Sequence, residues 1–288
     1  MSSSPIIILG MHRSGTSMLA SFLEKAGLFI GYKKEANNES VFFRDINEWV
    51  LKEANASWDN PINLQYIDTE FINYVTHIIQ IRFKFFSYQF LGPKNTFRYW
   101  SINNLNIKWG WKDPRNSILW PLWKNIFPNA RFIHIVRNPI DVAVSLQVRA
   151  RKARLKQKDS RAKFRDIYTA FRLVKSNYTD SIVTFDLKYN INLWEYYTNK
   201  ILELEKDISN RDIIHVRYED FLLSPYMSFK SILNFCSISI DDKKIKKIIS
   251  RVNQDRRFVF FQDETLKKLY NSVKNRSLFK RFNYHNLL

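Results

Sequence analysis

Short apolar runs alternate with helical patterns along the first half of the chain. Residues 5–9, Pro-Ile-Ile-Ile-Leu, fit a buried central strand of a parallel sheet. From Met18 to Ala26 the apolar residues have helical spacing, and Gly27 is a suitable C-terminal cap. A second apolar run at 130–136 precedes another helix start at Asp141. These strand–loop–helix units predict a parallel α/β sheet.

The rest of the chain adds helices without marking a second domain. The periodicity predicts one further strand at 213–217 and helices at 44–56, 67–90, 191–208, 227–236 and 242–252. No repeat, low-complexity linker or domain joint is visible, so we expect a single domain over residues 1–288. The predicted class is an α/β, P-loop-like three-layer fold. Its central parallel sheet would have four or five strands flanked by helices.

The turn after the first strand has the outline of a phosphate-binding loop. It reads Gly10-Met-His-Arg-Ser-Gly-Thr-Ser17, two glycines five apart that precede a pair of hydroxyls. In nucleoside-triphosphate loops the second glycine is followed by a lysine that reaches the phosphates and a hydroxyl that holds Mg²⁺. Here Thr16 replaces that lysine, and Arg13 is the nearest cation. The loop N–H groups can still bind an anion, but Mg²⁺-dependent triphosphate hydrolysis is disfavoured.

A second anion site is predicted at the end of the second long strand. Arg137 follows that strand, and Ser145 comes eight residues later on the next predicted helix. Ligands of doubly wound sheets lie beyond the carboxyl ends of the strands. Arg137 and Ser145 are therefore candidates to hold a second phosphate in the same crevice as the first loop.

Taken in order, these motifs resemble the sulfotransferases. The resemblance rests on the lysine-free Gly-x-x-Arg-Ser-Gly-Thr-Ser loop, the Lys112-Asp-Pro turn, the segment 127–132, and Arg137-Asn-Pro with Ser145. A weaker match runs from 212 to 236. The most similar branches by motif are bacterial sulfotransferases, tyrosylprotein sulfotransferases and heparan-type carbohydrate sulfotransferases. The resemblance implies transfer of a sulfuryl group from 3′-phosphoadenosine 5′-phosphosulfate (PAPS) to a hydroxyl acceptor, with a glycan or glycolipid mildly preferred.

The resemblance also implies roles for particular residues. It places Lys112 at the transferring group, although a surface lysine in a turn is the alternative, and it leaves Asp113 and Arg115 to organise that turn. Arginine suits both phosphate sites because its planar fork matches an oxyanion. The implied donor-binding residues are Arg13, Ser14, Gly15, Thr16 and Ser17 for the 5′-phosphosulfate, and Arg137 and Ser145 for the 3′-phosphate.

The general base is harder to place. Heparan-type enzymes carry a Glu-x-x-Phe-Phe sequence, which Glu39 would begin in this chain. Many bacterial relatives instead have a glutamate at the position of Phe43, so Glu39 rests on one of two alignments. The alternative is a solvated loop glutamate. His12, inside the phosphate loop, is the second candidate for the base, and Asp45 is the third.

The charge is strongly positive. Lys and Arg number 46 against 27 Asp and Glu, a formal net charge of +19. Residues 149–165 alone hold nine cations and one acid. Such a field attracts a nucleotide donor, an anionic glycan or an anionic membrane, while a solvated basic helix is the plainest alternative. Arg256 and Arg257 could approach the 3′-phosphate. Nucleic acid is disfavoured because no recognition motif is present.

Composition narrows the remaining choices. The chain shows no transmembrane run, signal peptide or metal-site spacing, and Cys236 is its single cysteine. We therefore expect a cytoplasmic protein without a metal, with the inner membrane face as a second location. Two other function classes stay open: a P-loop nucleotide kinase or GTPase, and a non-catalytic nucleotide-binding protein. A sugar ring could stack on Trp58, Trp100, Trp109 or Trp111, although core packing explains these residues equally well.

Overall fold

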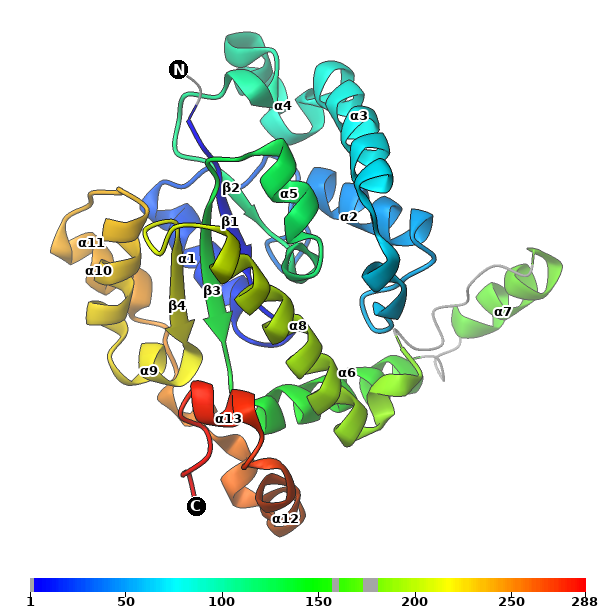
Figure 1. Ribbon diagram of the computed structural model, residues 1–288, viewed down its shortest axis with the longest axis vertical. Helices are drawn as coiled ribbons and strands as arrows, with labels where there is room; N and C mark the ends of the chain where they lie inside the picture. Colours follow the sequence, from blue (N-terminus) through cyan, green and yellow to red (C-terminus); the bar gives the residue numbers. More distant parts are fainter. Residues whose placement is uncertain (1–2, 157–160, 173–180) are drawn as a thin grey trace. The chain divides into compact units, whose positions relative to one another are not determined.

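The computed structural model describes residues 3–156, 161–172 and 181–288, and its centre is a four-stranded parallel sheet (Figure 1). The strands are β1 (Ile6–Leu9), β2 (Gly110–Lys112), β3 (Arg131–Val136) and β4 (Ile213–Arg217), in the order β2-β1-β3-β4. All three neighbouring pairs are parallel. The predicted α/β class is confirmed.

One face of the sheet is covered by four helices. These are α1 (Thr16–Ala26), α9 (Tyr218–Leu223), α10 (Pro225–Phe235) and α11 (Asp242–Ile249). Their apolar residues form a single buried cluster with Ile6 and Ile8 of β1 and Ile133 and Ile135 of β3. The alternation along each strand sends these side chains to one face, because successive residues of a strand point to opposite sides.

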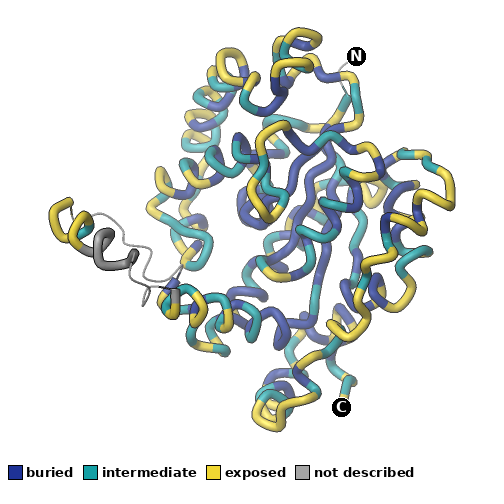
Figure 2. The backbone as a smooth tube through the Cα atoms, turned by 180° about the vertical axis from the view of Figure 1, so that it is seen from behind, coloured by how far each residue is buried: buried dark blue, intermediate teal, exposed yellow. Residues whose placement is uncertain are grey.

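Aromatic packing fills the opposite face. The helices there include α2 (Val41–Glu53) and α5 (Trp120–Ile126), and α3 (Thr69–Phe86) and α4 (Tyr88–Tyr99) pack against them. The Phe43 ring stacks on Trp111 of β2 with 3.9 Å between centroids. Trp123 meets Trp111 edge-on at 4.9 Å. Trp109 and Trp111 are therefore core residues, and Figure 2 shows mostly buried, dark blue residues along the strands of the sheet.

The chain divides into two compact units. The first comprises residues 1–138 and 196–259 and contains the sheet, and the second comprises 139–195 and 260–288. The second unit holds α6 (Pro139–Lys156), α7 (Arg161–Arg172), the first part of α8 (Leu187–Asp207), α12 (Glu264–Val273) and α13 (Ser277–Arg281). Within it, Asp141 accepts a hydrogen bond from the Phe260 backbone at 3.1 Å. The single-domain organisation stays a prediction.

Most predicted elements are present with shifted ends. The helix predicted over 67–90 is wrong in extent, because α3 ends at Phe86 and a separate α4 follows. Ser87 lies at the break, where its hydroxyl accepts from the Ile102 backbone at 3.1 Å. Strand β2 was not predicted, because its three residues are too few to show a periodic pattern. Short 3₁₀ segments complete the described chain at Ile62–Tyr66, Ile102–Asn104, Pro114–Ser117, Val183–Phe185, Gln254–Arg256 and Val259–Gln262.

Among the helices that the structure describes, none has both the length and the apolar character needed to cross a membrane.

A histidine pair, with His134 buried and His215 half-buried, joins β3 to β4. His134 and His215 are register partners, and their Nδ1 atoms lie 2.8 Å apart. Burial and the neighbouring His215 hold the pKa of His134 well below its ordinary value. The folded protein therefore keeps His134 neutral, whereas the unfolded chain binds a proton below pH about 6.5.

We predict that the melting temperature falls as the pH drops below about 6.5, because protons then favour the unfolded chain. Thermal unfolding of wild type and His134→Gln between pH 5 and 8 measures this. The variant should show a flatter pH dependence, while His77→Gln on the exposed face of α3 should behave as wild type. An unchanged slope for His134→Gln would contradict the prediction.

Candidate active site

The carboxyl ends of three adjacent strands meet at one edge of the sheet. Strand β1 lies between β2 and β3, so the chain leaves it toward one side and later returns on the other. In the register, Ile8 pairs with Lys112 and Leu9 with His134. The loop after β1, Lys112 at the end of β2 and Arg137 just beyond β3 therefore lie along the same edge. This is the topological switch point, where α/β sheets bind ligands.

Both loop glycines are required by close backbone packing. Gly10 has φ of 144°, and a Cβ there would lie 2.5 Å from the Ile135 carbonyl oxygen. Gly15, with φ of 97°, is the N-cap of α1, and a Cβ there would lie 2.5 Å from the Tyr218 ring. The Gly10 N–H donates to the Ser117 hydroxyl at 2.9 Å, which fixes the start of the loop.

The loop has the features of an anion cradle. It runs directly into the eleven-residue helix α1, whose first N–H groups have no carbonyl partner within the helix. Ser14 is fully buried, and among the described residues its hydroxyl has no hydrogen-bond partner. Arg13 is exposed at the tip, with a left-handed φ of 73°. Thr16 is buried at the position of the missing lysine. A phosphate or sulfate group fits these residues.

Glu39 and Lys112 form a buried ion pair beside this edge. Lys112 Nζ lies 2.8 Å from Glu39 Oε1, and the two side chains are 1% and 12% exposed. The alternatives of a surface lysine and a solvated glutamate are thus excluded. Asn38, next to Glu39, donates its side-chain amide to the Ser17 carbonyl at 3.2 Å. This contact ties the segment that carries Glu39 to the start of α1.

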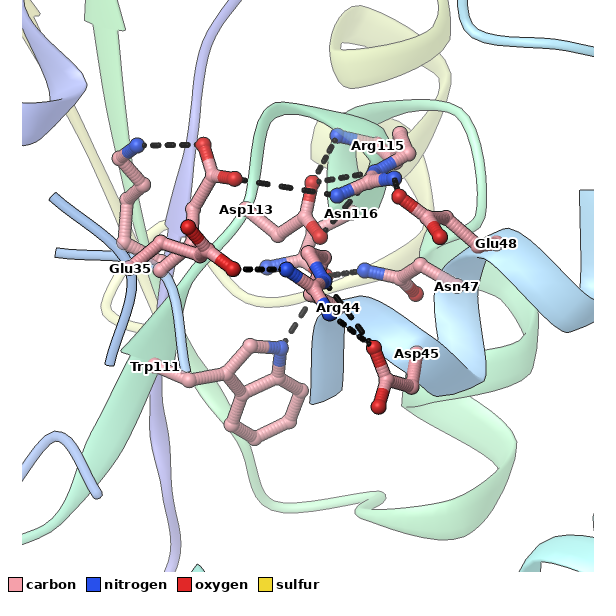
Figure 3. Close-up of polar contacts among 11 residues, drawn as sticks. Glu35, Arg44, Asp45, Asn47, Glu48, Trp111, Asp113, Arg115 and Asn116 are labelled. Carbon is pink, nitrogen blue, oxygen red and sulfur yellow. Dashed lines mark hydrogen bonds and ion pairs between the residues drawn. The ribbon is translucent and has the colours of Figure 1, made fainter. Parts of the chain in front are cut away.

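A network of carboxylates around Arg115 supports the ion pair (Figure 3). Arg115 contacts Asp113 and Glu48, each at 2.8 Å, and Glu39 Oε2 at 3.8 Å. Burial alone would lower the pKa of the Arg115 guanidinium, but the charges of Asp113 and Glu48 raise it above its ordinary value. Arg115 is therefore a fixed cation that orients Glu39, and it organises the Lys112-Asp-Pro turn as the sequence predicts.

Arg137 lies against the phosphate loop. Its Nη1 donates to the Arg13 carbonyl at 3.4 Å, and its Nη2 donates to the Arg256 carbonyl at 3.1 Å. The guanidinium lies over the Tyr218 ring, 4.8 Å from its centroid. The structure thus brings together the loop and the predicted clamp arginine, with the 253–257 segment beside them.

The other two candidate bases have different surroundings. The His12 ring packs on Trp58 with 4.6 Å between centroids and lies 6.3 Å from Tyr197. Tyr197 donates its hydroxyl to the Trp58 carbonyl at 2.8 Å, and burial raises its pKa well above the ordinary value. His12 is therefore held by aromatic packing within the loop. Asp45 pairs with Arg44 at 2.6 Å and lines a separate cavity beside α4.

Ser145 and most of the basic run belong to the second unit. Ser145 is half-buried on α6, and its pairing with Arg137 around a 3′-phosphate stays a prediction. Arg154 of the same helix lies over the Phe185 ring, 3.9 Å from its centroid. Residues 157–160 of the basic run 149–165 lie outside the described residues.

Comparison with known proteins agrees with this geometry. Residues 5–242 match the model of the sulfotransferase family. This chain belongs to that family.

A solved sulfotransferase domain shares the fold. The sulfotransferase domain of the Synechococcus PCC 7002 olefin synthase is 17% identical, with a TM-score of 0.50, over 98% of this chain and 95% of that domain. A sulfotransferase from Alicyclobacillus acidocaldarius is 13% identical, with a TM-score of 0.48, over 100% of this chain and 98% of that one. At 17% identity, the likeness to the olefin synthase domain shows the fold alone. Among curated protein sequences, none matches significantly.

Several residues of the candidate active site were not assigned from the sequence. Ser117 accepts from the loop, Tyr218 stacks on Arg137, and Glu219 accepts from the Asn138 N–H at 2.9 Å. Tyr218 and Glu219 lie after β4 in the segment that weakly matches the family. The sequence therefore marked this segment but gave neither residue a role. No sequence signal marked Ser117.

Proposed function

We propose that this protein transfers a sulfuryl group from PAPS to a hydroxyl acceptor. Family membership supports a transferase that uses a nucleotide donor. The observation that carries the proposal is the buried Glu39–Lys112 pair, which lies at the same sheet edge as a lysine-free phosphate loop. The missing lysine disfavours a Mg²⁺-dependent kinase. A protein that only binds a nucleotide would gain nothing from this ion pair, although its burial costs desolvation free energy.

Two groups of residues would hold the donor. The N–H groups of Gly15, Thr16 and Ser17, with the Ser14 hydroxyl and Arg13, fit the 5′-phosphosulfate. Arg137 and Ser145 would hold the 3′-phosphate, with Arg137 placed beside the loop by its contact with the Arg13 carbonyl. When bound, PAPS supplies an activated sulfuryl group on its 5′-phosphate. The acceptor oxygen forms the new S–O bond as the bond to the 5′-phosphate breaks.

Glu39 and Lys112 would divide the catalytic work. The Glu39 carboxylate takes the proton of the acceptor hydroxyl, so that the oxygen attacks as an alkoxide. The Lys112 ammonium faces the charge that develops on the transferring group and on the leaving phosphate. Arg115 holds Glu39 in place through the 3.8 Å contact. His12 remains the second candidate for the base.

The acceptor class remains broad in this proposal. A glycan or glycolipid hydroxyl stays our preference, but Trp109 and Trp111 do not support it because both are buried in the core. Trp58, half-buried against His12 of the loop, is a ring that a sugar could contact. A cytoplasmic location and the absence of a metal stay part of the proposal.

The donor assignment predicts nucleotide preference. The protein should bind 3′-phosphoadenosine 5′-phosphate more tightly than ATP, and EDTA should leave that binding unchanged, because we propose two phosphate sites and the loop lacks the lysine of a Mg²⁺-dependent nucleotide site. Isothermal titration calorimetry with both nucleotides measures this. Tighter binding of ATP, or loss of binding in EDTA, would contradict the proposal.

The clamp assignment predicts a selective loss. Arg137→Ala should weaken binding of 3′-phosphoadenosine 5′-phosphate by about 2–4 kcal/mol, the range for a desolvated charge-assisted contact. Binding of adenosine 5′-phosphate should change much less. Arg131→Ala, at the other end of the same strand, is the matched control and should bind both as wild type does. Equal losses for both nucleotides in Arg137→Ala would show that Arg137 does not read the 3′-phosphate.

The catalytic assignment predicts a loss of turnover. Glu39→Gln should lower turnover by about 10²–10⁴ with donor affinity nearly intact, because a positioned base is removed without a change of size. Lys112→Ala should lower turnover at least as much. Glu35→Gln, in the same loop, and Lys108→Ala, an exposed lysine just before β2, are matched controls. Near-normal turnover in Glu39→Gln together with inactive His12→Ala would transfer the role of base to His12.

A further inference from the structure

One long stretch of the chain carries no negative side chain. Between Glu70 and Asp113 the sequence contains neither Asp nor Glu. The same stretch is rich in aromatic residues and forms α3, α4 and the segment that leads to β2. Its cations are Arg82, Lys84, Lys94, Arg98, Lys108 and Lys112. Apart from Lys112, none of these takes part in the proposed chemistry.

Large aromatic side chains of this stretch are exposed to an unusual degree. Phe97 is 86% and Trp100 76% exposed, and Tyr32, from the segment after α1, is 65% exposed. Tyr88 and Phe86 are about half exposed, and their ring centroids lie 6.4 Å apart. We call Tyr32, Phe86, Tyr88, Phe97 and Trp100 the α4 aromatic surface. Exposed apolar residues gathered in this way mark an interaction site.

A cavity of about 770 Å³ is lined by four of these five residues. Tyr32, Tyr88, Phe97 and Trp100 line it, and Phe42 of α2 contributes a buried ring to its wall. Lys33 is also part of the lining. The single carboxylate among the lining residues is Asp45, which pairs with Arg44 at 2.6 Å, and Arg44 also pairs with Glu35. The cavity is therefore apolar inside, with Lys33 and the Arg44–Asp45 ion pair at its border.

Cations frame the surface directly. Arg82 lies over the Phe42 ring at 5.0 Å and over the Phe86 ring at 5.7 Å. Lys94 and Arg98 are exposed on α4, and Arg98 follows Phe97 in the sequence. Aromatic rings with a surrounding of lysine and arginine are the composition of membrane-interface sites, where the rings enter the headgroup region and the cations meet anionic lipids.

The chain after α4 lies away from the phosphate loop, although the cavity beside α4 also includes Asp45, the third candidate base. The chain that leaves α4 reaches the amino end of β1, where Ser3 N–H donates to the Leu105 carbonyl at 2.7 Å and Ile6 N–H to the Trp109 carbonyl at 2.9 Å. Lys112 and the phosphate loop lie at the opposite, carboxyl end of the strands. Figure 1 shows α4 near the N-terminus, at the end of the sheet where the strands begin. A partner bound at α4 would therefore leave the phosphate loop open.

We propose that the α4 aromatic surface docks the protein on an anionic phospholipid bilayer. Residues 71–112 contain no Asp or Glu, which avoids repulsion from anionic lipid headgroups. A second copy of the chain or a protein partner of mixed charge would not require the exclusion of acids, so we favour the bilayer as the occupant. The aromatic rings enter the interface while Lys33, Lys94 and Arg98 face the lipid headgroups. This proposal does not rest on the sulfuryl-transfer chemistry.

Vesicle co-sedimentation of the full chain tests it. The protein should bind vesicles of phosphatidylglycerol and phosphatidylcholine, bind pure phosphatidylcholine at least tenfold more weakly, and lose binding in high salt. Trp100→Gly should weaken binding at least about tenfold, and glycine suits the positive φ of 61° at this position. The double variant Lys94→Gln with Arg98→Gln should lose a similar factor, about one tenfold step or more.

Matched controls distinguish binding through the α4 aromatic surface from binding through exposed cations or exposed aromatic rings elsewhere. Tyr66→Ala removes a ring that is 77% exposed elsewhere, and Lys246→Gln with Lys247→Gln removes two exposed cations of α11. Both should bind vesicles as wild type does, and all variants should keep wild-type affinity for 3′-phosphoadenosine 5′-phosphate. The proposal is overturned if the wild type does not bind anionic vesicles. It is also overturned if the controls lose as much as the test variants, or if Trp100→Gly instead dissociates a dimer seen by sedimentation velocity.

Discussion

The buried ion pair between Glu39 and Lys112 is the contact on which the arrangement of the candidate active site depends. It joins the segment before α2 to the end of β2, across 73 positions of the sequence. A lysine with 1% of its side chain exposed requires a carboxylate partner, since removal of one partner from a buried pair costs about 3–5 kcal/mol. The position of β2 beside the phosphate loop and the position of Glu39 are thereby coupled.

The surroundings of the pair explain why it is tolerated. Asp113, Glu48 and Arg115 form a second set of charges next to it, with each Arg115 contact to Asp113 and Glu48 at 2.8 Å. On the other side, the aromatic packing of Phe43 and Trp111 fixes α2 against β2. Lys112 and Arg115 are thus held against a packed core, and their contacts with Glu39 position that loop residue, as electrostatic catalysis requires.

The sequence predicted the parts of the site that have a local pattern. The glycine spacing of the phosphate loop, the strands at 6–9, 131–136 and 213–217, and the α/β class all follow from short-range periodicity. The Glu39–Lys112 contact could not be read in this way, because it depends on the pairing of β1 with a three-residue strand. The break at Ser87 was equally invisible, since a long-range hydrogen bond from Ile102 fixes it. The roles of the individual site residues remain predictions.

A crystal structure of the protein with 3′-phosphoadenosine 5′-phosphate tests the central claim most directly. The account predicts the 5′-phosphate on the loop from Arg13 to Ser17, the 3′-phosphate against Arg137 and Ser145, and Glu39 and Lys112 beside the 5′-phosphate. Such a complex would place the base and the neutralising cation where sulfuryl transfer requires them. A nucleotide bound away from the loop, or bound there with Glu39 and Lys112 remote from the 5′-phosphate, would contradict the account.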